Sequence, residues 1–393
     1  MRAFESDERI VFVTLDLLIV VGQFRPLVGG AERQAERLAA ALVRAGHRVA
    51  ITTRLLEAAH PREETLLGVP VRRLGFAARS GFRIRKMERA TFAWSLWRQL
   101  ATNPDSRPVL VQHLLYPALV AAFARGRRRW PLILRVSSTG ETSDFEAWGV
   151  FSTFVHGYLR TRVAALVALN EEGRREAVAK GYAADRIVVI PNGVEVGSPP
   201  TPRPRDRPAR VLHVGGLRSE KRLDVLLTAW RHAGAPGELT LVGDGPERGR
   251  LEALASSLGI HVTFAGNVDE PDVMQRDADI LVLSSDAEGM SNALLEGMAA
   301  GCACVATYVG GNIDCLAPGA TEPASSEWIS GPFGWLVRRG DAAALGRALL
   351  KLCEERETRD RLGEAARERA CSEYALPRVA SLYADLLTRV TAA

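Results

Sequence analysis

Short apolar runs alternate with longer amphipathic stretches along most of this chain. In the first half, the runs that predict strands are 10–14, 48–53, 109–112, 132–136, 165–169 and 187–190, and the stretches that predict helices include 31–45 and 171–180. A second series of predicted strands begins at 210–214 and continues through 238–242, 262–265, 279–283 and 304–306. Strands that alternate with helices in this way predict parallel, doubly wound α/β sheets.

A proline-rich segment separates the two series. Residues 197–208 contain five prolines, which predict a linker. The predicted organisation is a Rossmann-like domain at 1–196, a linker at 197–209, a second Rossmann-like domain at 210–370, and a segment at 371–393. The helix of this last segment, about 373–388, is expected to pack back on the N-terminal domain. Two parallel sheets that face each other place a ligand cleft between the ends of their strands.

The length and the cysteine content agree with this organisation. A chain of 393 residues is too long for one ordinary core, so two domains are expected. The apolar stretch 10–22 is interrupted by Asp16 and has no basic leader, so we interpret it as a buried first strand and not as a signal peptide or membrane span. The five cysteines match no zinc-binding spacing and indicate free thiols in a reducing cytoplasm.

Basic residues are concentrated in the first half of the chain. Residues 1–200 hold 29 Lys and Arg against 19 Asp and Glu, whereas residues 201–393 hold 22 against 27. Arginines are interleaved with aromatic residues at 76–100 and again at 125–130. Two interpretations stay open: a surface that docks on a membrane or an anionic acceptor, or solvated helix faces whose aromatic residues lie in the core. No nucleic-acid recognition module is visible, so nucleic acid is not expected as a partner.

Two glutamates eight residues apart carry the strongest chemical signal. Glu288 lies in the loop that follows the predicted strand 279–283, and Glu296 lies inside a short predicted helix, about 292–301. The N–H groups at a helix N-terminus favour an anionic ligand, and carboxylates accept hydrogen bonds from sugar hydroxyls. The pair therefore predicts a nucleotide-sugar site.

Glycine-rich turns occur at other predicted strand ends. Gly29 and Gly30 open the first helix, and Gly215 and Gly216 precede Arg218 and Lys221, which would bind a diphosphate. The alternative is tight turns with solvated charges. The backbone at 262–268 could bind a base edge. The pair Asp277 and Asp279 has no further ligand beside it, so no metal site is expected.

Together these motifs resemble the retaining GT-B glycosyltransferases of family 4, the glycosyl transferases group 1. The resemblance rests on the order and spacing of 29–33, 190–194, 215–221, 243–246, the Glu288 to Glu296 element, Gly301 and 305–307. It implies a GT-B fold, with two Rossmann-like doubly wound domains facing each other across a cleft. It also implies retaining, metal-independent hexosyl transfer by a cytoplasmic bacterial enzyme that needs no cofactor, with a UDP-sugar as first expectation for the donor and a GDP-sugar as second.

The resemblance also implies roles for the domains and for single residues. The domain at 1–196 would bind the acceptor, and the domain at 210–370 would bind the nucleotide sugar. Glu288 would contact the donor sugar, Glu296 the ribose, and Arg218 with Lys221 the diphosphate, so Glu288, Arg218 and Lys221 are the expected catalytic residues. The further expected donor contacts are Gly29, Gly30, Gly216, Asn267, Val268, Gly289, Met290, Ser291 and Asn292.

The chain departs from the family pattern at two positions. Gly216 stands where many relatives have arginine, and Ser137 takes the place of a histidine that many relatives have near the reacting carbon. The acceptor-side candidates are His113, Ser137, Thr139, Glu141 and Asp144. The acceptor would be an envelope glycan, a lipid-linked sugar reached at the inner face of a membrane, or a small natural product. A nucleotide-sugar 2-epimerase-like enzyme and a non-catalytic donor-binding partner subunit stay open as alternatives.

Overall fold

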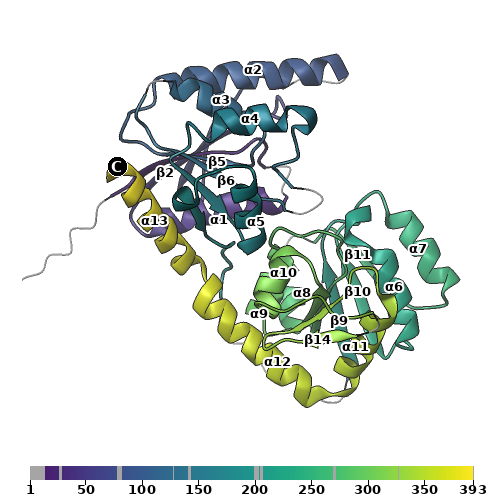
Figure 1. The fold of residues 1–393 in the computed structure, drawn as a ribbon. Coiled ribbons are helices and arrows are strands. Elements are labelled where there is room, and N and C mark those ends of the chain that lie inside the picture. The colour runs from purple at the N-terminus through teal and green to yellow at the C-terminus, as the bar shows by residue number, and fades with distance from the viewer. Residues whose placement is uncertain are drawn as a thin grey trace, which may run out of the picture.

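The computed structural model describes residues 14–25, 29–77, 82–126, 128–139, 143–198, 203, 207–268, 271–325 and 327–392, with the backbone alone at 82–86 and 271. Two sheets, each covered by helices on both faces, make up this part of the chain (Figure 1). No helix in the described residues combines the length and the apolar composition that a membrane span requires.

The N-terminal sheet has eight strands in the order β3-β4-β2-β1-β5-β6-β7-β8. The strands are β1 (Asp16–Val20), β2 (Arg48–Arg54), β3 (Glu63–Leu66), β4 (Val69–Leu74), β5 (Val109–Gln112), β6 (Leu132–Arg135), β7 (Ala165–Ala168) and β8 (Ile187–Val189). All neighbours pair in parallel except β3 and β4, which form an antiparallel hairpin at the edge. The carboxyl ends of the parallel strands therefore share one edge, which is where ligands bind in such sheets.

Helices cover both faces of this sheet because successive side chains of its strands point to opposite sides. The helices of this half are α1 (Gly30–Arg44), α2 (Phe82–Ala101), α3 (Tyr116–Arg125), α4 (Ser152–Leu159) and α5 (Glu171–Ala179), with 3₁₀ turns at Gly149–Phe151 and Ala184–Arg186. Leu17 and Ile19 face the core beneath α1, whereas Leu18 and Val20 face the core beneath α2, α3 and α4.

The C-terminal sheet has seven strands in the order β11-β10-β9-β12-β13-β15-β14. Its strands are β9 (Ala209–Val214), β10 (Gly237–Val242), β11 (Thr263–Gly266), β12 (Ile280–Leu283), β13 (Ala303–Thr307), β14 (Trp328–Ser330) and β15 (Trp335–Val337), of which only β14 runs antiparallel to its neighbour. Its helices are α6 (Leu223–His232), α7 (Arg248–Ser257), α8 (Pro271–Asp277), α9 (Asn292–Ala299), α10 (Gly310–Leu316), α11 (Ala342–Glu354) and α12 (Arg356–Arg369), with a 3₁₀ turn at Ser219–Lys221.

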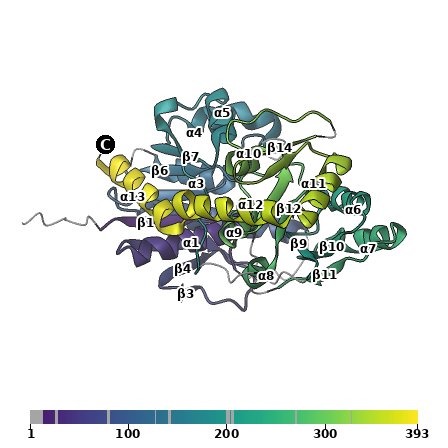
Figure 2. The ribbon, with the colours of Figure 1, turned by 90° about the horizontal axis from the view of Figure 1, so that it is seen from below.

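The last helix returns to the N-terminal sheet. A π-helical turn (Ala370–Tyr374) joins α12 to α13 (Leu376–Ala392), and Figure 2 shows this pair of helices running along both halves of the molecule. Six side chains of α13 complete the core beneath α1: Leu376, Val379, Ala380, Tyr383, Leu386 and Leu387. Beside the π turn, the backbone N–H of Val194 donates to the Tyr374 carbonyl at 2.8 Å, and that of Leu376 donates to the Val194 carbonyl at 2.9 Å. The two segments that cross between the halves are thus bonded to each other.

The buried first strand expected within 10–22 is present, but not over the narrower range 10–14. Strand 10–14 was expected, but β1 runs over Asp16–Val20 and Thr14 precedes it, while residues 10–13 lie outside the described residues. The apolar run from Leu17 to Val21 is uninterrupted and supplies both faces of a central strand, which pairs with β2 and β5. The edge hairpins β3–β4 and β14–β15 were not predicted.

Candidate functional site

Glu288 and Lys221 form an ion pair at the carboxyl edge of the C-terminal sheet. Glu288 follows β12, and its Oε1 accepts from Lys221 Nζ at 2.6 Å and from Ser285 Oγ at 2.8 Å. Ser284 Oγ donates to the Lys221 carbonyl at 2.8 Å, which fixes the 3₁₀ turn beside this loop. The two predicted residues therefore meet, with Glu288 mostly buried and Lys221 partly open to solvent.

The loop that carries Glu288 rests on a second glycine turn. The N–H of Gly311 donates to the carbonyls of Glu288 at 3.3 Å and Gly289 at 3.1 Å. A Cβ at Gly310 would collide with the Glu288 carbonyl oxygen, and the φ of Gly310 is 32°. Only glycine fits this close approach of two backbones, so the first turn of α10 sets the position of the Glu288 loop.

Glu296 is bound by an arginine of the other domain. It lies on α9, its side chain is 7 % exposed, and its Oε1 is 2.7 Å from Arg37 Nη1 and 3.9 Å from Arg33 Nη1. Its Oε2 is 3.5 Å from Gln275 Nε2 on α8. The carboxylate predicted to hold a ribose therefore already has cationic and amide donors, and α1 supplies the cations.

The N-termini of α1 and α9 face each other. Asn292, the first residue of α9, donates from Nδ2 to the Gly30 carbonyl at 2.9 Å and accepts at Oδ1 from Gln34 Nε2 and from Asn192 Nδ2, both at 2.9 Å. Ser291 caps α9 by accepting from the Leu294 N–H at 3.4 Å. Helix N-termini favour anions, and at α1 the buried Glu32 carboxylate already accepts from the Gly29 N–H at 3.0 Å, whereas the first turn of α9 has no acidic residue.

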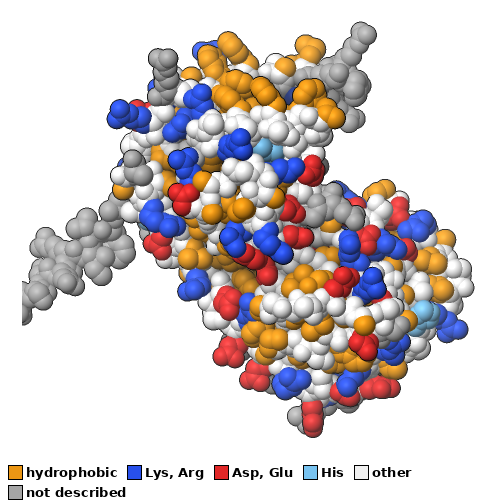
Figure 3. Space-filling view, in the orientation of Figure 1, with side chains coloured by type: hydrophobic (Ala, Val, Ile, Leu, Met, Phe, Trp, Pro, Cys, Tyr) orange, Lys and Arg blue, Asp and Glu red, His pale blue; other side chains and the backbone are white. Residues whose placement is uncertain are grey.

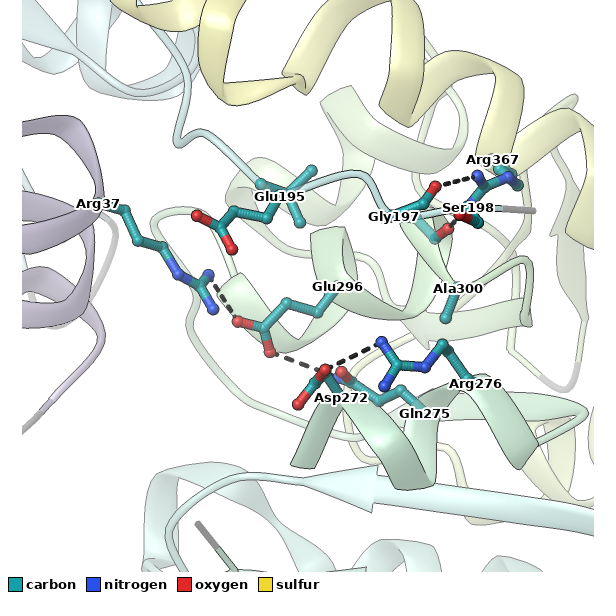
Figure 4. A pocket seen from close by; sticks show the side chains of 12 residues that line it. Arg37, Glu195, Gly197, Ser198, Asp272, Gln275, Arg276, Glu296, Ala300 and Arg367 are labelled. Carbon is teal, nitrogen blue, oxygen red and sulfur yellow. Dashed lines mark hydrogen bonds and ion pairs between the residues drawn. The ribbon is translucent and has the colours of Figure 1, made fainter. Parts of the chain in front are cut away.

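A cavity of about 290 Å³ lies beside Glu296 (Figure 4). Residues of α1, α8, α9, α12 and the crossing segment 194–198 line it. Its polar walls carry both signs of charge, with Arg37, Arg276 and Arg367 against Glu195, Asp272 and Glu296. Arg276 and Arg367 are held in place, because Arg276 pairs with Asp272 at 3.0 Å and Arg367 donates to the Gly197 carbonyl at 2.7 Å.

The acceptor-side candidates gather after β5 and β6. Asp144 is buried, and its Oδ2 accepts from the Ser137 N–H at 2.8 Å while its Oδ1 is 3.4 Å from His113 Nδ1. A Cβ at Gly289 would lie 2.5 Å from the Ser137 carbonyl oxygen, so this cluster touches the Glu288 loop across the domains. Thr139 Oγ1 donates to a carboxylate of α5 at 3.0 Å. The fifth candidate, Glu141, lies outside the described residues.

Of four other residues predicted to contact the donor, Arg218 and Asn267 are exposed, Val268 is half-buried and Met290 is buried. Arg218 precedes the 3₁₀ turn and is exposed, its N–H donates to the Gly216 carbonyl at 2.9 Å, and its guanidinium has no ion-pair partner within the described chain. Asn267 is exposed and Val268 is half-buried after β11. Met290 is buried, and its carbonyl accepts from Asn192 Nδ2 at 3.1 Å.

Several residues of the site were not predicted. Arg37 and Gln34 lie on the face of α1 that meets α9, and Asn170 donates from Nδ2 to the Gly289 carbonyl. The i, i+4 spacing of Arg33 and Arg37 was the available signal for a basic helix face.

His213, also not predicted, is fully buried beneath the Gly215 turn. Its Nδ1 is 3.1 Å from the Val282 carbonyl oxygen, and burial lowers its pKa to about 4. A neutral imidazole therefore supports the turn that leads to Arg218 and Lys221. Within the described part of the chain, no three His, Cys, Asp or Glu side chains are grouped to hold a metal ion.

Two protein-family models match the chain in succession. Residues 29–193 match the glycosyl transferase 4-like domain, and residues 199–369 match the glycosyl transferases group 1. Among curated relatives, the chain is 28 % identical over 177 residues to the N-acetyl-alpha-D-glucosaminyl L-malate synthase of Bacillus anthracis, covering 44 % of this chain and 43 % of that one. It is 31 % identical over 189 residues to a lipopolysaccharide core biosynthesis glycosyltransferase of Rhizobium meliloti, covering 47 % and 51 %. The chain thus spans about half the length of these relatives.

Other similarities extend over nearly the whole chain. The glycogen synthase of Mycobacterium tuberculosis is 26 % identical, with 94 % of each chain covered. Among solved structures, sucrose-phosphate synthase of Thermosynechococcus elongatus superposes with a TM-score of 0.78 at 20 % identity, covering 96 % of this chain and 99 % of that one. Anabaena HepE in complex with UDP superposes with a TM-score of 0.74 at 17 % identity, covering 95 % and 100 %. The structural likeness confirms the predicted GT-B fold.

Proposed function

This chain carries a glycosyl transferase 4-like domain followed by a domain of the glycosyl transferases group 1, and on that premise we propose that it moves a hexose from a nucleotide-diphosphate sugar to an acceptor hydroxyl with retention of configuration. The proposal is carried by one observation: the Lys221–Glu288 pair, Glu296 and the facing N-termini of α1 and α9 gather where the two domains meet. This arrangement offers a cation and helix N-termini to a diphosphate and carboxylates to sugar hydroxyls.

In the proposed reaction, Lys221 and Arg218 stabilise the charge that develops on the diphosphate. The bond between the anomeric carbon and the diphosphate oxygen breaks, and the diphosphate leaves with the bonding electrons. The acceptor hydroxyl attacks the same face of the sugar, and the leaving diphosphate takes its proton, so no protein base is required. Charge-assisted contacts aimed at a developing charge lower the barrier more than they strengthen substrate binding.

A UDP-sugar is the proposed donor, with a GDP-sugar as the second choice. Support comes from the fold neighbour HepE, which has been solved with UDP and with UDP-glucose. A thermal-shift series with UDP-, GDP-, ADP- and dTDP-sugars tests the donor, because a ligand at about 100 times its Kd stabilises the folded protein by about 2.7 kcal/mol. Stabilisation by GDP-sugars alone would favour the second choice, and none by any of the four would contradict the proposal.

The role of Glu296 is tested by calorimetry with the donor that this series identifies. Glu296→Ala removes charge-assisted hydrogen bonds to the ribose worth roughly 1.5–3 kcal/mol, so affinity should fall about tenfold or more. Glu252→Ala, which removes an exposed carboxylate of α7, is the matched control and should bind the donor normally. Unchanged donor affinity in Glu296→Ala would exclude Glu296 from the donor site.

The proposed acceptor is a hydroxyl of an envelope glycan, a lipid-linked sugar or a small natural product, received beside Ser137 and His113. Product analysis by NMR after incubation with donor and a panel of acceptors tests retention, and activity that persists in a metal chelator tests the proposed metal independence. A new nucleotide sugar formed without acceptor would identify an epimerase. Donor binding without turnover across a broad acceptor panel would identify a non-catalytic subunit.

A further inference from the structure

Large apolar side chains are exposed mainly on one part of the N-terminal domain. Thirteen large apolar side chains are exposed among the described residues, and eight of them lie between residues 87 and 154. Of the thirteen, Val273 alone belongs to the C-terminal half. The eight are Met87, Trp94, Trp97, Leu115, Phe123, Val150, Phe151 and Phe154. They belong to α2, α3, α4 and the turns that precede α3 and α4, and we call them the α2–α4 surface.

Helix α2 is apolar on two opposite sides. Phe92, Leu96 and Leu100 are fully buried against the sheet. On the outward side Trp94 is 61 % exposed and Trp97 is 40 % exposed, and their rings stack with centroids 5.3 Å apart. A surface helix normally presents polar residues to water, so this second apolar side requires a partner.

The apolar side chains continue across the neighbouring helices. Helix α3 packs against α2, and α4 packs against α3. Phe123 of α3 stacks on Tyr158 of α4 with centroids 4.8 Å apart, and Phe154, which is 79 % exposed, lies one helical turn before Tyr158. Figure 3 shows hydrophobic side chains gathered along the upper margin of the molecule, over α2. Because these three helices pack in succession, their exposed apolar side chains lie on the same part of the domain.

The charge around this surface is strongly positive. Residues 82–101 contain five basic residues and a single acidic one, Glu88, and residues 123–130 contain four arginines and no acid. Among the described side chains, Arg89, Arg98, Arg128, Arg129 and Arg160 are exposed. Arg162 lies over the Tyr158 ring at 5.3 Å. Aromatic rings surrounded by arginines are typical of proteins that lie in the headgroup region of anionic bilayers.

We propose that the α2–α4 surface docks on an anionic lipid bilayer, with its Trp and Phe side chains at the boundary between headgroups and acyl chains and its arginines on lipid phosphates. A second copy of this chain is a poorer partner, because a two-fold contact would bring the same arginines face to face. Helices α2 and α3 follow β4 and β5 and so begin at the carboxyl edge of the sheet, where His113 lies. Docking would therefore bring the acceptor side of the site close to the lipid. Binding of the protein to the bilayer does not depend on the proposed reaction.

The test is cosedimentation of the full chain with vesicles of phosphatidylcholine, alone or mixed with phosphatidylglycerol. Wild type should bind the mixed vesicles and lose most of that binding in high salt. Trp94→Ser combined with Trp97→Ser, and separately Arg128→Ala combined with Arg129→Ala, should each lower the partition coefficient about tenfold or more. Val273→Ser and Arg250→Ala, exposed substitutions on the C-terminal half, should bind as wild type does.

Equal binding to neutral and mixed vesicles, or binding to neither, would overturn the proposal. So would a concentration-dependent dimer, seen by sedimentation velocity, that the double tryptophan variant abolishes, since the surface would then be an interface between copies. The midpoint of thermal unfolding without ligand should stay close to that of wild type in every variant, which shows that the fold is intact. A failure of vesicle binding therefore leaves the proposed donor site untouched, and a failure of donor binding leaves the docking surface untouched.

Discussion

Arg37 on α1 and Glu296 on α9 form an ion pair across the two domains, with Nη1 2.7 Å from Oε1. If Glu296 holds the ribose, as proposed, the nucleotide and Arg37 compete for the same carboxylate. The Arg37–Glu296 ion pair then has to break before the nucleotide can bind Glu296, so the ion-paired state and the donor-bound state exclude each other.

Arg37→Ala should therefore tighten nucleotide binding. The pair is partly exposed on the arginine side, so its loss removes a competitor worth about 0.2–1 kcal/mol, and affinity measured by calorimetry should rise by a factor of roughly 1.4 to 5. The control is Arg44→Ala. It lies on the same helix as Arg37, breaks only the exposed pair with Glu195, and should leave affinity unchanged. Weaker binding in Arg37→Ala would mean that Arg37 contacts the ligand itself.

Lys221→Ala should depress turnover far more than it depresses the thermal midpoint. The lysine supplies the charge proposed to stabilise the leaving diphosphate, and removing one such donor costs about 10²–10³ in kcat. Steady-state kinetics with the identified donor measure the effect, with the exposed Lys351→Ala as control. A kcat within threefold of wild type, about 0.65 kcal/mol, would remove Lys221 from the reaction.

His113→Gly should be more stable than His113→Ala by about 1 kcal/mol. His113 has a φ of 70°, a conformation that costs an L-residue with a Cβ but not glycine. Both variants lose the contact with Asp144, so the difference between their free energies of unfolding reports the backbone strain at residue 113. Thermal unfolding of the two variants side by side measures it, and an alanine variant at least as stable as the glycine variant would contradict the strained backbone.

The stability of the protein should fall between pH 6.5 and pH 4 partly because of His213. Burial lowers its folded pKa to about 4, whereas the unfolded chain keeps the usual value near 6.5. The unfolded state therefore binds the proton first as pH falls, and the folded state loses at most about 3 kcal/mol across this window, with full stability above it. His213→Gln should flatten the pH profile of unfolding by that amount, and the exposed His261→Gln should not. Superimposable profiles for wild type and His213→Gln would show that this imidazole is not buried in the neutral form.

Much of the fold could be predicted because the sequence patterns that indicate strands, turns and helices are local. Strand runs, glycine turns and the spacing of Glu288 and Glu296 are all read within a few residues, and they predicted two doubly wound domains and a short helix at α9. The first strand was expected within 10–22, but its bounds could not be predicted, because that stretch contains two apolar runs, 10–14 and 17–21. The bounds of β1 follow from its pairing with β2 and β5, and pairing with distant segments does not show in the local sequence.

The partners of the site residues could not be predicted for the same reason. Arg37 meets Glu296 and Asn292 meets Gly30 across more than 250 positions of sequence, and each contact depends on how two domains face each other. His113 and Asp144 were separate candidates, 31 positions apart, and the ends of adjacent strands β5 and β6 bring them together. The role of each residue in donor or acceptor binding stays a prediction for the experiments above.

The return of α13 to the first sheet has a consequence for synthesis of the protein. Chains emerge from the ribosome N-terminus first, and N-terminal domains generally fold as they emerge. Here Tyr383 and Leu387 fill the core beneath α1, so the first domain stays open along one face until α13 has been translated. A chain that ends before α13 lacks six side chains of that core, and its first domain is left with an exposed apolar face.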